Sequence, residues 1–148
     1  MNPIHIEYFN AIGMEQPLVD RVSDLISLAE NIWEISINDI LITNYPTEEG
    51  RSMFEHLWMV SDSNILEAKN FISETDIDIA KICKINYIRI KTKNYNFSKA
   101  ENNSTMTIRA NTGRIEFNYK AYQDNCDFLY SFFKKYIKPN IDSIVHTK

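Results

Sequence analysis

Several side chains in the second half of the chain have the types and the spacing of an anion-binding surface. Arginine and lysine recur at every second position of the expected strands, which sets their charged heads on one side of a sheet. Such cations neutralise phosphate or carboxylate groups, and an aromatic ring among them can stack on nucleic-acid bases. We call this set the basic face: Tyr87, Arg89, Lys91, Lys93, Arg109, Arg114 and Lys120.

The basic face is open to three interpretations. The first is a solvated outer sheet surface whose lysines discourage edge-to-edge aggregation. The second is a docking surface for an acidic protein or a second copy of the chain. The third is a binding surface for nucleic acid or an anionic membrane. Residues 1–80 carry 15 acidic and 3 basic side chains, a net charge of −12, whereas residues 81–148 carry 13 basic and 5 acidic, a net charge of +8. The acidic half is itself a candidate partner, which favours protein over nucleic acid.

The expected C-terminal helix, over residues 124–138, is the second candidate surface. Its apolar arc is wider than the roughly 100° that a helix needs to pack on one core. Phe128, Phe132 and Tyr136 are the candidate interface residues on this arc. We expect the surplus to be covered by a helix over residues 17–33, or else by a second subunit or a partner protein.

The histidines do not form a recognisable catalytic or metal site. None has a second histidine or a cysteine at metal-ligand spacing, and strand alternation sends His56 and its neighbour Glu55 to opposite faces. The sequence contains no phosphate-binding loop, nucleophile elbow or dinucleotide fingerprint. We therefore predict no catalytic residue, metal or cofactor, and an enzyme of unknown chemistry is the least favoured class. The three histidines are His5, His56 and His146.

The helices and strands that position these residues are predicted from the periodicity of apolar residues and from the proline, turn and capping residues between them. Pro17 opens an amphipathic stretch over 17–33, which predicts a helix, while residues 1–16 fit a short strand or an irregular arm. Over residues 35–121 the pattern of apolar side chains has a period of two, which predicts strands. Within 77–98 the apolar side chains change from one face to the other, which requires a break between two strands. Asn111-Thr112-Gly113 joins a hairpin, and Asp124 is a natural N-cap for the last helix.

This order of patterns resembles the pleckstrin-homology-like (PH-like) barrel, in particular the short bacterial PH-like or GRAM-type domains. The resemblance covers about residues 35–138: an early hairpin over 52–71, middle strands over 76–93, and the last hairpin and helix over 104–137. It implies a partly open barrel and a non-enzymatic adaptor that binds peptides, lipids or copies of itself. The loop over 47–51 is acidic, unlike the basic loop of the family members that bind phosphoinositides. The runner-up is another α+β fold with helices on one face of an antiparallel sheet.

Length and composition favour one domain over residues 1–148. The hydrophobic fraction is 44% and the charged fraction 24%, as in globular proteins. No apolar run approaches the ~20 residues that span a bilayer, and residues 1–16 lack the pattern of a signal peptide, so we expect a cytoplasmic protein. The prediction is an α+β domain of six or seven antiparallel strands that binds a protein partner or itself; a nucleic-acid or anionic-ligand binder is the alternative.

Overall fold

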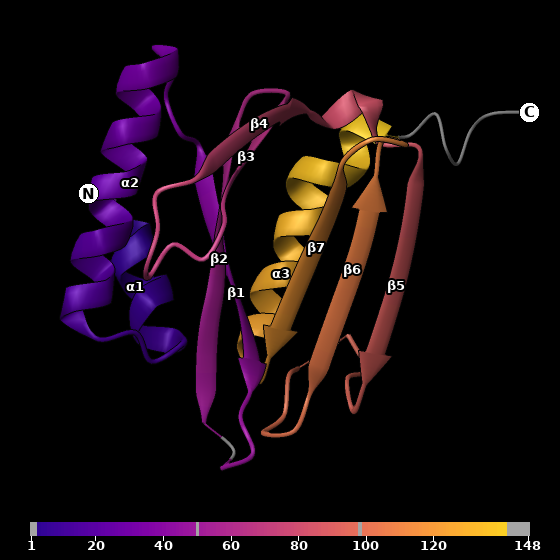
Figure 1. Cartoon of the computed structure of the whole chain (residues 1–148). Helices are drawn as coiled ribbons and strands as arrows, with labels where there is room; N and C mark the ends of the chain where they lie inside the picture. Colours follow the sequence, from indigo (N-terminus) through magenta and orange to yellow (C-terminus); the bar gives the residue numbers. More distant parts are fainter. Residues whose placement is uncertain (1–2, 50, 98, 142–148) are drawn as a thin grey trace, which may run out of the picture.

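The computed structural model of the chain describes residues 3–49, 51–97 and 99–141. Within them, N-terminal helices precede seven antiparallel strands in two open sheets, and a C-terminal helix follows, so the fold is α+β as predicted (Figure 1). The four-stranded sheet has the order β1 (Asp39–Pro46), β2 (Ser52–Ser61), β3 (Asn64–Ala68) and β4 (Ile77–Lys81). The three-stranded sheet has the order β5 (Tyr87–Lys93), β6 (Thr105–Asn111) and β7 (Glu116–Tyr122).

The helices α1 (Pro3–Ala11) and α2 (Gln16–Trp33) lie beside the four-stranded sheet, on the side away from β5–β7 (Figure 1). The predicted helix over 17–33 is confirmed as α2. Its proline lies in the first turn, where the missing N–H costs no hydrogen bond, and Val22, Leu25 and Ala29 are buried. The helix ends at Glu34, whose φ of 53° is left-handed and stops the helical repeat.

The prediction of a strand or an irregular arm over residues 1–16 was wrong for the part that forms α1. The alternation that suggested a strand does not match the burial, because Ile6 is half exposed. Tyr8, Phe9 and Ile12 are buried instead, and their spacing is that of one helical face. This spacing was present in the sequence, and it is what brings Tyr8 against the strands.

A β-bulge in β2 changes the predicted relation between Glu55 and His56. The pairing of Ile42 with Leu57 is followed by that of Asn44 with Phe54, so Glu55 and His56 together oppose one residue of β1. A bulge places two successive side chains on about the same side, and His56 Nε2 lies 3.2 Å from Glu55 Oε1. The prediction that they point to opposite faces was therefore wrong. Burial lowers the pKa of His56 below its ordinary value, and the nearby carboxylate of Glu55 opposes this shift.

Side chains rather than a backbone ladder join the two sheets where β1 meets β7. Asn44 Oδ1 accepts from the backbone N–H of Tyr122 at 2.9 Å and from Asn125 Nδ2 at 2.8 Å. Asn125 Nδ2 also donates to the Ile42 carbonyl at 2.7 Å, and its Oδ1 accepts from the Tyr8 hydroxyl at 2.8 Å. Because these amide and hydroxyl groups are buried, the hydrogen bonds fix the angle between the sheets.

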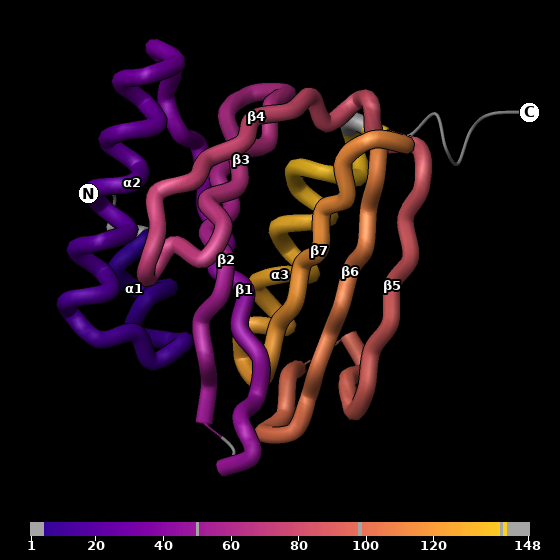
Figure 2. The backbone as a smooth tube through the Cα atoms, in the orientation of Figure 1, coloured from indigo at the N-terminus to yellow at the C-terminus, as the bar shows by residue number. Residues whose placement is uncertain are grey.

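The hydrophobic core continues between the inner faces of the two sheets. Trp58 of β2 packs on Tyr119 and Phe117 of β7, with ring centroids 4.3 and 5.7 Å apart. The predicted break in the middle strands is confirmed: β4 and β5 are separated by a short 3₁₀ turn, Ile82–Lys84, at which the chain passes from one sheet to the other (Figure 2).

The last helix, α3 (Asn125–Phe132), continues through a π turn at Phe133–Ile137 and lies behind β6 and β7 (Figure 1). The predicted extent of 124–138 is close to this. Asp124 lies at the N-cap position, as predicted, but its side chain makes no capping hydrogen bond. The next residue, Asn125, turns its amide into the seam between the sheets.

Candidate functional site

The basic face lies on the outer side of the three-stranded sheet, with one exception. Cross-strand pairing sets Arg89 opposite Arg109, and Thr107 lies between Lys91 and Lys120. Arg114 is instead in the turn between β6 and β7. Six of the seven residues thus lie on one face of the sheet, and Arg114 lies at the turn that ends it. They differ in their availability to a ligand, because some of the cations already form ion pairs within the chain.

Two of the cations are paired within the chain. Arg109 makes a two-nitrogen contact with Glu116 Oε1, at 2.8 Å from Nη2 and 2.9 Å from Nε. Lys120 lies 3.5 Å from Glu55 Oε1 and 5.7 Å from the centre of the Tyr45 ring. These contacts relieve the repulsion expected between like charges on neighbouring strands.

The remaining cations of the sheet are gathered on β5. Arg89, Lys91 and Lys93 are exposed and make no ion pair with any residue that the structure describes. Tyr87, at the start of the strand, is 49% exposed. Among the described strands β5 pairs only with β6, and it forms the outer edge of the sheet, far from α2 (Figure 1).

An apolar groove runs along the inner side of β5, between this strand and the C-terminal helix. Ile90 faces it and is 47% exposed, although it is flanked by the buried Met106 and Ile108 of β6. The groove has a volume of about 280 Å³. We call it the β5 groove; it is lined by Ile90, Met106, Ile108, Tyr130, Phe133, Lys134 and Lys138.

The aromatic residues near the basic face lie mostly on the other side of the sheet. Tyr95 and Phe97 follow β5 but fold back onto the helix, where Phe97 packs edge-on against Tyr130 at 5.1 Å. The Tyr95 hydroxyl donates to Asp127 at 2.7 Å. Tyr87 is therefore the one aromatic residue in the basic face as defined above, and the exposed ring of Tyr45 lies beside its Lys120. These two rings provide little surface for stacking bases.

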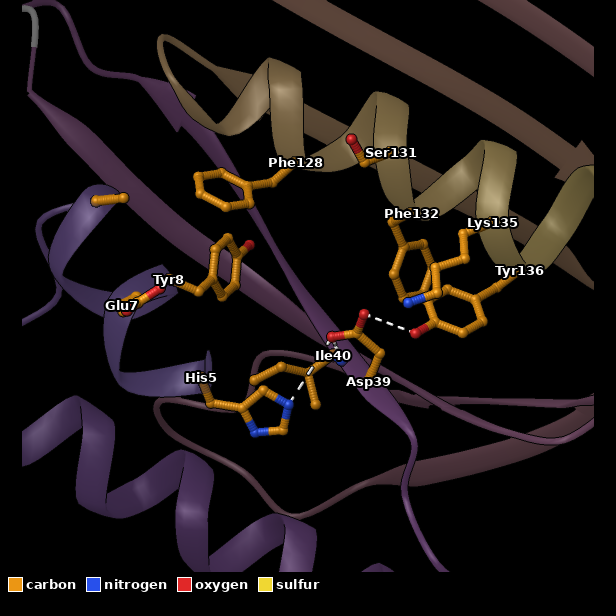
Figure 3. Close-up of a pocket in the computed structure, with 11 residues that line it drawn as sticks. His5, Glu7, Tyr8, Asp39, Ile40, Phe128, Ser131, Phe132, Lys135 and Tyr136 are labelled. Carbon is orange, nitrogen blue, oxygen red and sulfur yellow. Dashed lines mark hydrogen bonds and ion pairs between the residues drawn. The ribbon is translucent and has the colours of Figure 1, made fainter. Parts of the chain in front are cut away.

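The candidate interface residues of the C-terminal helix line a second groove, the aromatic groove, between α1 and α3 (Figure 3). Its volume is about 480 Å³. Tyr136 lies on the same side of the helix as Phe128 and Phe132, as their four-residue spacing predicts (Figure 3). The groove is lined by His5, Glu7, Tyr8 and Ala11 of α1, Asp39 and Ile40 of β1, and Phe128, Ser131, Phe132, Lys135 and Tyr136 of the helix.

Asp39 connects the polar groups at the floor of the aromatic groove. Its Oδ2 accepts from the Tyr136 hydroxyl at 2.8 Å, and its Oδ1 accepts from the Ile40 N–H at 2.8 Å. His5 Nε2 lies 3.8 Å from the same Oδ1 (Figure 3). Burial lowers the pKa of His5 despite the nearby carboxylate, so its ring is neutral at pH 7.

The helix that covers the surplus apolar arc is α1, rather than the helix over 17–33 expected from the sequence. Tyr8 of α1 packs edge-on against Phe128 with ring centroids 4.7 Å apart. His5 and Tyr8 were not predicted as site residues because α1 itself was not predicted, and Asp39 of β1 was not predicted because α1 forms the opposite wall of its groove. His146, the third histidine considered above, lies outside the described residues.

A scan against protein-family models gave no match, and comparisons with curated proteins and with solved structures gave none either. No helix within residues 3–49, 51–97 and 99–141 is long and apolar enough to cross a membrane. In the same ranges, no group of three or more histidine, cysteine, aspartate or glutamate side chains is placed to hold a metal ion. Function therefore has to be inferred from the two grooves and the edge strand.

Proposed function

We propose that this protein is a non-enzymatic interaction domain that binds an acidic, extended segment of a partner protein by strand addition to β5. The observation that carries the proposal is the combination on one strand of an open edge, unpaired cations on one face and an apolar groove on the other. Strand addition obtains affinity from main-chain hydrogen bonds and specificity from side chains that alternate between the two faces.

The geometry defines the sequence pattern of such a segment. A strand added beside β5 sends alternate side chains to opposite faces of the sheet. On the outer face they meet Arg89, Lys91 and Lys93, which favours aspartate or glutamate. On the inner face they enter the β5 groove beside Ile90, which favours aliphatic or aromatic residues. The expected ligand therefore alternates acidic and apolar residues over the length of β5.

Charge argues against a second copy of β5 as the added strand. Antiparallel pairing of two β5 strands about Ile90 would set Arg89 of each copy opposite Lys91 of the other. Like charges directly opposite one another on a sheet destabilise the pairing. An acidic strand in the same place would instead neutralise both cations.

The order of elements supports a distant relationship to the PH-like domains. The resemblance rests on a run of antiparallel strands closed by a C-terminal helix, and the seven antiparallel strands of the two sheets are followed by such a helix. On this proposal α1 and α2 are additions to the family's core. The acidic loop between β1 and β2, with Glu48 and Glu49 beside Arg51, weighs against an anionic lipid as the ligand.

Fluorescence anisotropy with a labelled ten-residue peptide that alternates glutamate and leucine tests the proposal. Reversing an exposed charge removes an ion pair and adds a repulsion, which together amount to about 1 kcal/mol. The double substitution of Arg89→Glu with Lys91→Glu should therefore weaken binding roughly thirtyfold. Arg114→Glu, which makes the same change in the β6–β7 turn, is the matched control and should change affinity little.

Two further ligands separate strand addition from simple charge attraction. The same peptide with every backbone nitrogen methylated keeps its charge and apolar side chains but has no N–H group left on either edge to pair along a strand, so it should not bind. If it binds as well as the parent peptide, strand addition is wrong. If single-stranded DNA binds more tightly than the acidic peptide, and the Arg89→Glu and Lys91→Glu substitutions abolish this binding, the nucleic-acid alternative replaces the proposal.

A further inference from the structure

The aromatic groove presents two pairs of rings that face each other across an open space (Figure 3). One pair is Tyr8 with Phe128, at a centroid distance of 4.7 Å and an interplanar angle of 63°. The other is Phe132 with Tyr136, at 5.3 Å and 55°. The volume of about 480 Å³ lies within the range of small-molecule sites, about 300–1,000 Å³. A flat or globular apolar group fits between two such pairs.

The charges of the groove favour a cationic ligand over an anionic one. Asp39 lies on its floor, and Glu7 lies on its α1 rim. A carboxylate offers about four acceptor sites, so Asp39 Oδ2 still has capacity for a donor besides the Tyr136 hydroxyl. His5, which is neutral at pH 7, adds no positive charge to the floor.

The chain already supplies a cation of its own to this environment. Lys135 Nζ lies over the face of the Tyr136 ring, 5.2 Å from its centre, and in Figure 3 the ammonium turns toward the space between Phe132 and Asp39. Aromatic faces attract cations through the negative potential of the ring, most strongly where water is excluded. The long side chain of Lys135 is exposed and can leave when a ligand enters.

We propose that the aromatic groove binds a small organic cation, an amine or quaternary ammonium ion carried on an apolar or aromatic body. The apolar body lies between the two ring pairs. The charged nitrogen lies near Asp39 and the face of Tyr136, where it replaces the ammonium of Lys135. This site is separate from β5 and from the peptide ligand proposed above, so either proposal can fail alone.

Calorimetric titration with three benzyl probes of different charge tests the proposal on the unaltered chain. Benzyltrimethylammonium should bind with a dissociation constant of about 1 mM or tighter, as expected for a ligand of this size. Benzyl alcohol should bind several-fold more weakly, and phenylacetate should not bind. If phenylacetate binds as well as the cation, or if none of the probes binds at about 10 mM, the proposal is overturned.

The sharpest variant is Lys135→Met, which removes the internal cation and keeps a long apolar side chain. It should tighten binding of benzyltrimethylammonium about three- to fivefold, because the ligand no longer competes with a resident ammonium. Lys134→Met is the matched control: its ammonium lies 5.1 Å from the Tyr130 ring at the β5 groove, and affinity should not change. Weaker binding by Lys135→Met, or equal tightening by both variants, would refute the assignment.

Discussion

Glu67 carries a carboxyl group whose pKa the fold raises to about 7. It lies near the end of β3, opposite Trp58 of β2 and Asp78 of β4, and is only 5% exposed. Burial raises its pKa from 4.5 to about 7, with Lys69 opposing the shift and the neighbouring acidic side chain of Asp78 adding to it. The charged form is therefore more costly in the folded than in the unfolded chain.

The substitution Glu67→Gln should remove a pH-dependent destabilisation. Because the folded pKa is raised, the stability contribution of Glu67 is fully present below pH 4.5 and is lost as the pH rises through about 7. A shift of this size corresponds to about 3 kcal/mol in the free energy of unfolding. Glu67→Gln should thus approach the parent in stability near pH 4.5 and exceed it by up to about 3 kcal/mol at pH 8.

Urea unfolding at pH 5 and pH 8, followed by tryptophan fluorescence, measures the difference between the two chains at each pH. Trp58, buried beside Glu67, reports unfolding directly. Glu48→Gln, at an exposed position in the loop after β1, controls for the loss of one carboxylate. If the stability difference between Glu67→Gln and the parent is the same at both pH values, Glu67 ionises as an ordinary exposed glutamate and the reasoning is wrong.

Two substitutions test the seam and the last hairpin. Asn125→Ala removes the amide that joins the start of α3 to Asn44 and to the Ile42 carbonyl of β1, and it should lower the free energy of unfolding by about 3 kcal/mol. Asn103→Ala, in an exposed loop, should be nearly neutral in the same urea titration. Gly113→Ala should cost about 1 kcal/mol, because Gly113 has a φ of 93° although an added Cβ would meet nothing within 4 Å. Gly113→Asn should cost less when measured by the same urea titration, since asparagine tolerates the left-handed region; an equal loss would point to a cause other than backbone strain.

The periodicity of apolar residues correctly predicted the helices and strands that bury a single face. In the helix over 17–33 and the hairpin that begins near residue 104, apolar residues recur at regular spacing, and proline or a turn sequence marks the boundaries. Both form where expected. Helix α1 was missed because its residues fit a period of two as well as a helical one in so short a segment. The bulge at Glu55 and His56 was missed for a different reason: it depends on how β1 and β2 pair, which one strand's sequence does not encode.

The same distinction applies to the candidate sites. The alternation on β5 predicted that Arg89, Lys91 and Lys93 share a face, and their cross-strand partners agree. The helical repeat likewise predicted an aromatic arc. What the arc packs against could not be predicted, because the contact of Tyr8 with Phe128 joins residues 120 positions apart along the chain. Long-range contacts of this kind decide where a groove forms.

The uneven charge of the chain is only partly neutralised within the fold. If the acidic and basic halves served mainly to attract each other, ion pairs between them would be common. Among the described residues one such pair occurs, Lys120 with Glu55 at the seam between the sheets. The other ion pairs join residues of the same half, as Arg109 with Glu116 does. The cations of β5 lie at the edge of the molecule farthest from the acidic helix α2 (Figure 1), so the asymmetry remains on the surface. If the proposed function holds, a charge separation of this kind steers an acidic segment toward the open strand before any hydrogen bond forms, and it raises the rate of association more than the final affinity.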